Sequence, residues 1–112
     1  MDAWRDTLVT APEEIARIVR ECRRIAVLGS KTEAQRHEPA FYVPEYMARA
    51  GYDIVPLPVY YPDAIAILGR PVYRSVSEIL GPVDMVNVFR RPPDIPPHLP
   101  DLLTAQPRVV WF

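Results

Sequence analysis

Residues 25–31, IAVLGSK, decide the fold of this chain. An apolar run of four residues ends in Gly29, and Ser30 and Lys31 then turn the chain polar. Continuous apolar runs are typical of strands that are buried on both faces of a parallel sheet. A glycine and polar residues directly after such a strand are typical of a loop that binds phosphate. The segment therefore predicts a first parallel strand that leads into a ligand site.

Helix and strand patterns alternate on both sides of this segment. The second helix could begin near Ala40, and Ser75 with Glu78 forms a capping-box pattern at the start of the third helix. Alternation with right-handed crossovers predicts an α/β fold, a Rossmann-like doubly wound parallel sheet. The chain fits a single domain, 1–112, in which residues 1–11 form a lead-in. The helix patterns cover 11–23, 44–51, 75–80 and 94–105, and the strand patterns cover 25–29, 52–58, 83–89 and 108–112.

Composition narrows the classes of function. The chain has 13 basic and 14 acidic residues, so it lacks the basic excess that is typical of nucleic-acid binders. Its one cysteine, Cys22, cannot form an internal disulfide, and no cysteine–histidine spacing indicates zinc. No run reaches the ~18 apolar residues of a membrane span, and the acidic N-terminus does not resemble a signal peptide. We expect a cytoplasmic protein with no nucleic-acid or membrane partner, in which Cys22 is a structural thiol.

Three segments should meet where a ligand binds. In an open parallel sheet, ligands lie beyond the carboxyl ends of the strands, where the strand order reverses. Residues 29–32, 56–60 and 89–92 follow the first three strands and would converge there. These segments contribute Lys31 and the pair Arg90-Arg91. Together with backbone N–H groups and a helix N-terminus, these cations suit a phosphate or pyrophosphate.

Two other functions stay open on these patterns. An NAD(P)-binding oxidoreductase would need further glycines in the first loop and an acidic residue at the end of the second strand. That strand ends in Pro56, Leu57 and Pro58, which argues against NAD. A degenerate Rossmann-like fold serving as a protein-interaction module would use residues 108–112 and the Tyr60-Tyr61 loop as its surface.

No pattern indicates a catalytic centre. His37 lies in the loop after the first strand and His98 in a proline-rich turn, and we expect both to be ordinary surface histidines. Ser30 has no recognisable histidine–aspartate partner. Asp84 begins the third strand, at the sheet edge opposite the predicted site. We therefore expect a binding module with no catalytic residue.

Five stretches of the sequence carry a resemblance to a known family. They are IAVLGSK, PAFYVPEYMARAGYDIVPL, ILGRPVYRSVSEI, PVDMVNVFRRP and RVVWF, in that order along the chain. The sequence resembles the small stand-alone bacterial CoA-binding proteins, whose fold is similar to the CoA-binding domain of the succinyl-CoA synthetase α subunit. The resemblance implies coenzyme A or an acyl-CoA as the ligand. It implies binding without a reaction, because the phosphorylated histidine of that synthetase belongs to a domain not found here.

The resemblance also assigns site residues and points to two departures. Where the family has valine-asparagine-proline after the second strand, this sequence has Leu57-Pro58-Val59, and the family's last helix and strand are missing after 108–112. An apolar strand at a sheet edge predicts a homodimer through that strand. The residues that the resemblance implies are Gly29, Ser30 and Lys31 at phosphate, Tyr42 and Val43 flanking the site, Pro56 and Pro58 along the nucleotide, and Phe89, Arg90 and Arg91 on the opposite wall.

Overall fold

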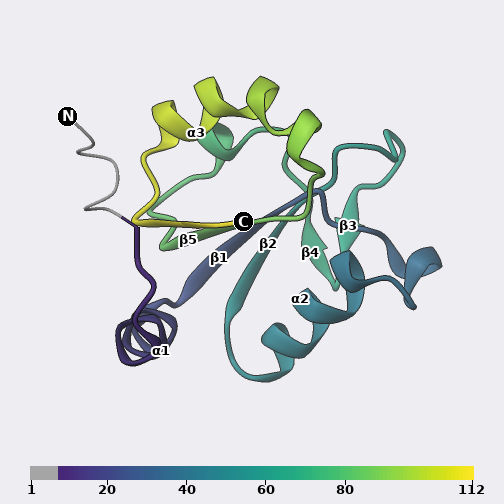
Figure 1. The fold of residues 1–112 in the computed structure, drawn as a ribbon. Helices are drawn as coiled ribbons and strands as arrows, with labels where there is room; N and C mark the ends of the chain where they lie inside the picture. Colours follow the sequence, from purple (N-terminus) through teal and green to yellow (C-terminus); the bar gives the residue numbers. More distant parts are fainter. Residues whose placement is uncertain (1–7) are drawn as a thin grey trace.

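The structure is a computed structural model that describes residues 8–112. Most of the predicted lead-in, residues 1–7, lies outside the described part. A four-stranded sheet forms the centre of the fold (Figure 1). Its elements are α1 (Pro12–Glu21), β1 (Arg24–Leu28), α2 (Pro39–Arg49), β2 (Asp53–Leu57), β5 (Met85–Val88), α3 (Leu99–Ala105) and β6 (Val109–Trp111).

The sheet is parallel throughout and has the order β2-β1-β5-β6. The chain passes from β1 to β2 on one side and then returns across β1 to β5. The strand order therefore reverses between β1 and β5, and the carboxyl ends of these strands form the topological switch point. This arrangement confirms the predicted Rossmann-like doubly wound fold.

Both faces of the sheet are buried, which explains the continuous apolar run of β1. Ala26 and Leu28 pack in one core cluster with residues of the 76–79 turn and α3. Ile25 and Val27 pack in a second cluster with residues of α1 and α2 and with Cys22, which directly follows α1 and is fully buried. Figure 1 shows α3 on one side of the sheet and α1 and α2 on the other. The predicted role of Cys22 as a structural thiol agrees with this burial.

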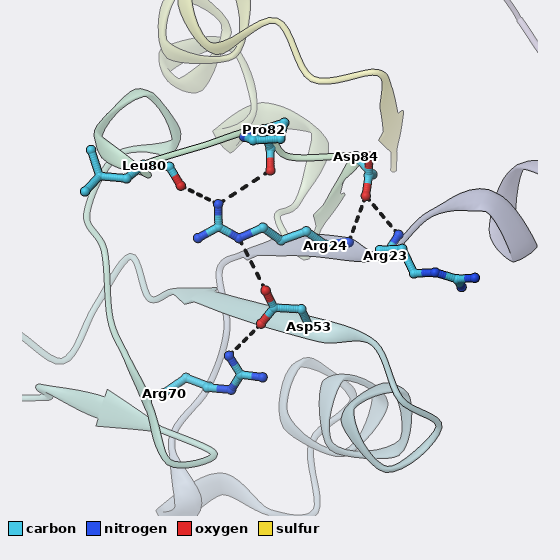
Figure 2. Close-up of polar contacts among 7 residues, drawn as sticks. All are labelled: Arg23, Arg24, Asp53, Arg70, Leu80, Pro82 and Asp84. Atoms are coloured by element: carbon cyan, nitrogen blue, oxygen red, sulfur yellow. Dashed lines mark hydrogen bonds and ion pairs between the residues drawn. The ribbon is translucent and has the colours of Figure 1, made fainter.

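A carboxylate, that of Asp84, joins the amino ends of the strands, at the end of the sheet opposite the switch point. The Asp84 side chain accepts hydrogen bonds from the backbone N–H groups of Arg23 and Arg24, both at 2.9 Å. The Arg24 guanidinium donates to the carbonyls of Leu80 and Pro82 and forms an ion pair with Asp53 (Figure 2). These contacts fix the amino ends of β1, β2 and β5 relative to one another.

The helices after β1 agree with their predictions, except for the cap of the third. The second helix begins at Pro39, as its alternative start near Ala40 predicted. The third is a single 3-10 turn, η3 (Val76–Glu78), and the predicted capping box of Ser75 is wrong because its hydroxyl donates to Asp101 instead. The fourth, expected as a short helix that prolines interrupt at its start, consists of two 3-10 turns, η4 (Pro92–Asp94) and η5 (Pro96–His98), followed by α3, because the prolines there remove N–H donors.

A small hairpin in the long connection after β2 was not predicted. Strands β3 (Ala66–Ile67) and β4 (Arg70–Pro71) pair through a two-residue turn whose Leu68 and Gly69 both have positive φ. Such mirror-image turns match the twist of antiparallel strands. Glu33, in the 3-10 turn η2 (Glu33–Gln35), accepts a hydrogen bond from the Leu68 N–H at 2.9 Å. The hairpin is thereby tied to the loop that follows β1.

Candidate functional site

Gly29 forms the tight turn at the carboxyl end of β1. Its φ is +87°, a conformation that favours glycine. Its N–H donates to the Leu57 carbonyl, and the N–H of Phe89 donates to the Leu28 carbonyl, both at 2.8 Å. A Cβ on Gly29 would overlap the carbonyl oxygen of Phe89. The turn after β1 and the turn after β5 are therefore in direct backbone contact.

Ser30 is the buried polar residue of this site. It is 2% exposed, and among the described residues its hydroxyl has no hydrogen-bond partner. A buried hydroxyl without a partner costs roughly 1–3 kcal/mol. Such a group is a candidate ligand contact, because a bound acceptor or water would remove that cost.

Two cations face the site from two different loops. The Lys31 Nζ lies 3.5 Å from the Tyr61 hydroxyl and 5.8 Å from the centre of its ring. The Arg90 guanidinium lies 5.5 Å from the centre of the Tyr60 ring. Both distances fall within the range of cation–π attraction. The two neighbouring tyrosines therefore hold one cation each.

These side chains surround a small hollow of about 40 Å³. A volume of this size holds about one water molecule, so the hollow as it stands does not enclose a nucleotide. Its walls come from the carboxyl ends of β1, β2 and β5, which is the switch point. We call these residues the cradle; they are Gly29, Ser30, Lys31, Val59, Tyr60, Tyr61, Phe89 and Arg90.

His98 contacts Arg90, one of the cradle residues. The prediction that it is an ordinary surface histidine is therefore wrong. The Arg90 Nε donates to the His98 Nε2 at 3.3 Å, which requires that ring nitrogen to be unprotonated. Burial lowers the pKa of His98, and the nearby positive charge of Arg90 lowers it further. Both effects keep the imidazole neutral, the form that can accept from Arg90. His37, in contrast, is exposed, as predicted.

Five of the ten predicted site residues line the cradle, and the others lie elsewhere. Arg91 is highly exposed and pairs with Asp94 at 3.1 Å. Tyr42 and Val43 line a separate hollow along α2, of about 400 Å³. Pro56 and Pro58 are buried, and they contribute carbonyls that accept from Tyr73 and Arg74. The five that meet at the cradle are Gly29, Ser30, Lys31, Phe89 and Arg90.

Tyr61 belongs to the cradle but was not assigned to a ligand site, and Val59 and Tyr60 were included only in the converging segment 56–60. Their position directly after the second strand was the available signal, since loops at this sheet edge form the site. The Tyr60-Tyr61 loop, which the interaction-module alternative would use as its surface, contacts Arg90 and Lys31, and Tyr60 is exposed.

Residues 8–112 also bear on metal binding and on membrane insertion. No group of three or more histidine, cysteine, aspartate or glutamate side chains in this part of the chain could hold a metal ion. In the same part, every helix is too short or too polar to cross a membrane.

The parallel sheet with a small cationic hollow at its switch point defines a Rossmann-like α/β domain. A family model described as "CoA binding domain" matches residues 23–112. The chain belongs to this family. An uncharacterised Bacillus subtilis protein, YneT, is 36% identical over 98 residues, which are 88% of this chain and 69% of that protein.

Two solved structures are similar over almost the whole chain. The structure of a Thermus thermophilus protein, cell-free ID.343, has a TM-score of 0.82 at 30% identity and covers 92% of this chain and 75% of its own. A hypothetical protein from Pyrococcus horikoshii OT3 has a TM-score of 0.80 at 28% identity, covering 92% of this chain and 69% of its own. Both support the fold assignment.

Proposed function

We propose that this chain binds coenzyme A or an acyl-CoA as a non-catalytic binding or regulatory module, with a ligand phosphate at the cradle. The family to which the chain belongs supports this ligand class. The observation that carries the proposed location is the buried, unpartnered hydroxyl of Ser30 beside Lys31 and Arg90. A phosphate there would accept from the hydroxyl and would pair with both cations.

The chemistry of coenzyme A suits this arrangement. The ligand carries a pyrophosphate and a 3′-phosphate, all of them anionic. Arg90 offers a planar group with several donors, whereas Lys31 offers a compact charge, and the two approach the cradle from opposite loops. Because the hollow is smaller than the ligand, a phosphate would lie at its opening, beside the two cations that the tyrosine rings contact, and the rest of the ligand would lie outside the hollow.

Calorimetric titration of the purified chain with coenzyme A, acetyl-CoA, NAD and NADP tests the proposal. We expect coenzyme A to bind in the micromolar range and NAD and NADP to give no heat. Lys31→Ala and Arg90→Ala should each weaken binding by about tenfold to a hundredfold, because a hydrogen bond to a charged group contributes about 1.5–3 kcal/mol. Arg91→Ala should have a smaller effect, because Arg91 pairs with Asp94.

Arg49 provides a matched control for these variants. It is highly exposed on α2 and pairs with Glu45, away from the cradle. Arg49→Ala should leave the affinity within about twofold of the wild type, as is usual for surface substitutions. If the wild type shows no binding of coenzyme A in the titration, the result contradicts the proposal. Binding of NAD would favour the oxidoreductase alternative. If none of the four ligands binds, the result would favour the interaction module.

A further inference from the structure

Arg74 is the most extensively bonded side chain of the loop that follows β2. Its two terminal nitrogens donate to backbone carbonyls at distances between 2.9 and 3.3 Å. Among the described residues, no acidic side chain forms an ion pair with it. Its partners are the carbonyls of Pro58, Tyr60, Tyr61, Pro62 and Ala64.

The β3–β4 hairpin explains how Arg74 reaches this loop. The Val72 N–H donates to the Ile65 carbonyl at 3.1 Å, which extends the pairing of the two short strands. The Tyr73 N–H then donates to the Pro56 carbonyl at 3.0 Å, so the chain returns to the end of β2. The next residue, Arg74, is thereby placed beside the 58–64 loop that it bonds.

The bonded loop carries the two tyrosines of the cradle. Tyr61 has φ +64°, a conformation that is uncommon for a residue with a side chain and that surrounding contacts must maintain. Arg74 bonds the carbonyls of both Tyr60 and Tyr61. It therefore fixes the backbone from which their rings reach Arg90 and Lys31.

We propose that Arg74 is a positioning residue for the ligand site: it holds the 58–64 loop so that Tyr60 and Tyr61 keep Arg90 and Lys31 in place for an anion. This inference rests on the proposed binding of coenzyme A. Arg74 acts through the loop and not on the ligand, because the donors of both its terminal nitrogens are already directed at five carbonyls. Ordering the loop in advance spares the ligand that entropic cost on binding.

Two substitutions of Arg74 and one matched control test the proposal. Arg74→Met keeps the length of the side chain and removes its donors, and we expect it to raise the Kd for coenzyme A about tenfold. Arg74→Lys keeps the charge but cannot reproduce the planar set of donors, so it should restore affinity only in part. Arg70, on the same hairpin, bonds Asp53 at the opposite sheet edge, and Arg70→Met should leave the Kd within about twofold.

A double-mutant cycle separates an effect through the loop from a direct one. In a chain that also carries Tyr60→Ala and Tyr61→Ala, Arg74→Met should change the Kd by less than about twofold, because its route to the cations is then removed. A tenfold loss that persists in this background would overturn the proposal, since Arg74 would then act on the ligand itself. Full recovery of affinity with Arg74→Lys would overturn it as well, since charge alone would then suffice.

Hydrogen–deuterium exchange tests the same inference without any ligand. The backbone amides of residues 59–64 should exchange at least about tenfold faster in Arg74→Met than in the wild type, and at the wild-type rate in Arg70→Met. Unchanged exchange in Arg74→Met would overturn the inference even if coenzyme A binds. If the wild type fails to bind coenzyme A, the proposed function fails, whereas accelerated exchange would still support the anchoring of the loop by Arg74.

Discussion

Gly29 lies so close to the carbonyl oxygen of Phe89 that no side chain fits between them. We predict that Gly29→Ala destabilises the fold by roughly 2–4 kcal/mol, because a positive φ costs about 1–2 kcal/mol for a residue with a Cβ and the overlap adds a further strain. It should also abolish detectable binding of coenzyme A, because the turns after β1 and β5 must separate. Urea unfolding and calorimetric titration measure the two effects.

Gly69 is the matched control for this substitution. Its φ is +71°, and a Cβ there would meet no atom within 4 Å. Gly69→Ala should therefore cost only about 1–2 kcal/mol, the conformational part, and should leave binding intact. Equal costs at the two positions would show that the contact with Phe89 carries no penalty.

The Asp84 carboxylate accepts from the backbone N–H groups of Arg23 and Arg24 (Figure 2), and the Asp84 carbonyl accepts from the N–H of Val109 at the start of β6. Asp84→Ala should cost roughly 1–3 kcal/mol, because the backbone N–H groups of Arg23 and Arg24 lose a charged acceptor. The affinity for coenzyme A should stay within about twofold of the wild type. Asp63→Ala, at an exposed position, serves as the control for loss of a carboxylate. Thermal unfolding of the three proteins would contradict the prediction if their midpoints coincide.

The run of β1 predicted its strand because both faces of the strand are apolar: Ala26 and Leu28 pack on one side of the sheet, and Ile25 and Val27 pack on the other. The sequence itself displays this property as an unbroken apolar run. The cradle was predictable in part, because loops after consecutive parallel strands meet at one edge whatever their detailed shape. The direction of an individual side chain was not predictable. Arg90 and Arg91 are neighbours with the same chemistry, yet one faces Tyr60 and His98 and the other faces Asp94.

The role of Arg74 could not be read from the sequence for a related reason. Its bonds to the 58–64 loop depend on a hairpin that reverses at Leu68-Gly69, and this pair lacks the asparagine or aspartate that usually marks such a turn. The Asp101 contacts with Ser75 likewise join residues far apart in the chain. A local pattern cannot reveal bonds that depend on how distant segments are packed.

His98 gives the fold a dependence on pH. Its pKa lies below the ordinary value of 6.5, first because of burial and then because of Arg90. The unfolded chain therefore takes up a proton first, and the stabilising contribution of His98 is fully present above about pH 6.5 and is lost as the pH falls through the folded-state pKa. We predict that the free energy of unfolding declines over this interval in the wild type.

His98→Gln should remove this part of the decline, because the amide oxygen can accept from Arg90 and does not titrate. His37→Gln, at an exposed position, should keep the wild-type profile. Urea unfolding between pH 7.5 and 5 compares the three proteins. If the free energy of unfolding declines with pH in the same way in the wild type and in His98→Gln, His98 does not contribute to the pH dependence of stability.

The outer edge of β6 predicts self-association. Strand β6 ends the sheet order, and the large side chains of Trp111 and Phe112 are 42% and 68% exposed. An apolar edge strand is a template for pairing with another chain. We expect a concentration-dependent dimer in light scattering coupled to gel filtration. Trp111→Lys combined with Phe112→Lys should shift it to monomer, whereas Leu103→Lys, on α3, should not. A wild type that is monomeric at every concentration would refute this expectation.

Asp101 stabilises the 3-10 turn that the sequence assigned to a capping box. Its carboxylate accepts from the Val76 and Ser77 N–H groups at 2.7 and 3.1 Å and from the hydroxyls of Ser75 and Ser77. Burial alone would raise the pKa of Asp101, but these hydrogen bonds outweigh it and lower the pKa. The stabilisation is therefore present above the ordinary value of 3.8 and is lost as the pH falls through the lowered pKa.

Asp101→Asn and Glu78→Gln distinguish the observed contact from the predicted one. Asp101→Asn should cost roughly 1–3 kcal/mol at pH 7, because a neutral amide cannot accept all four hydrogen bonds as a charged group does. Glu78→Gln should change stability by less than about 0.5 kcal/mol, since Glu78 is exposed. The difference between wild type and Asp101→Asn should shrink as the pH falls below the ordinary value of 3.8 and through the lowered pKa of Asp101. If Glu78→Gln is instead the more damaging change in urea unfolding, the turn depends on the capping box after all.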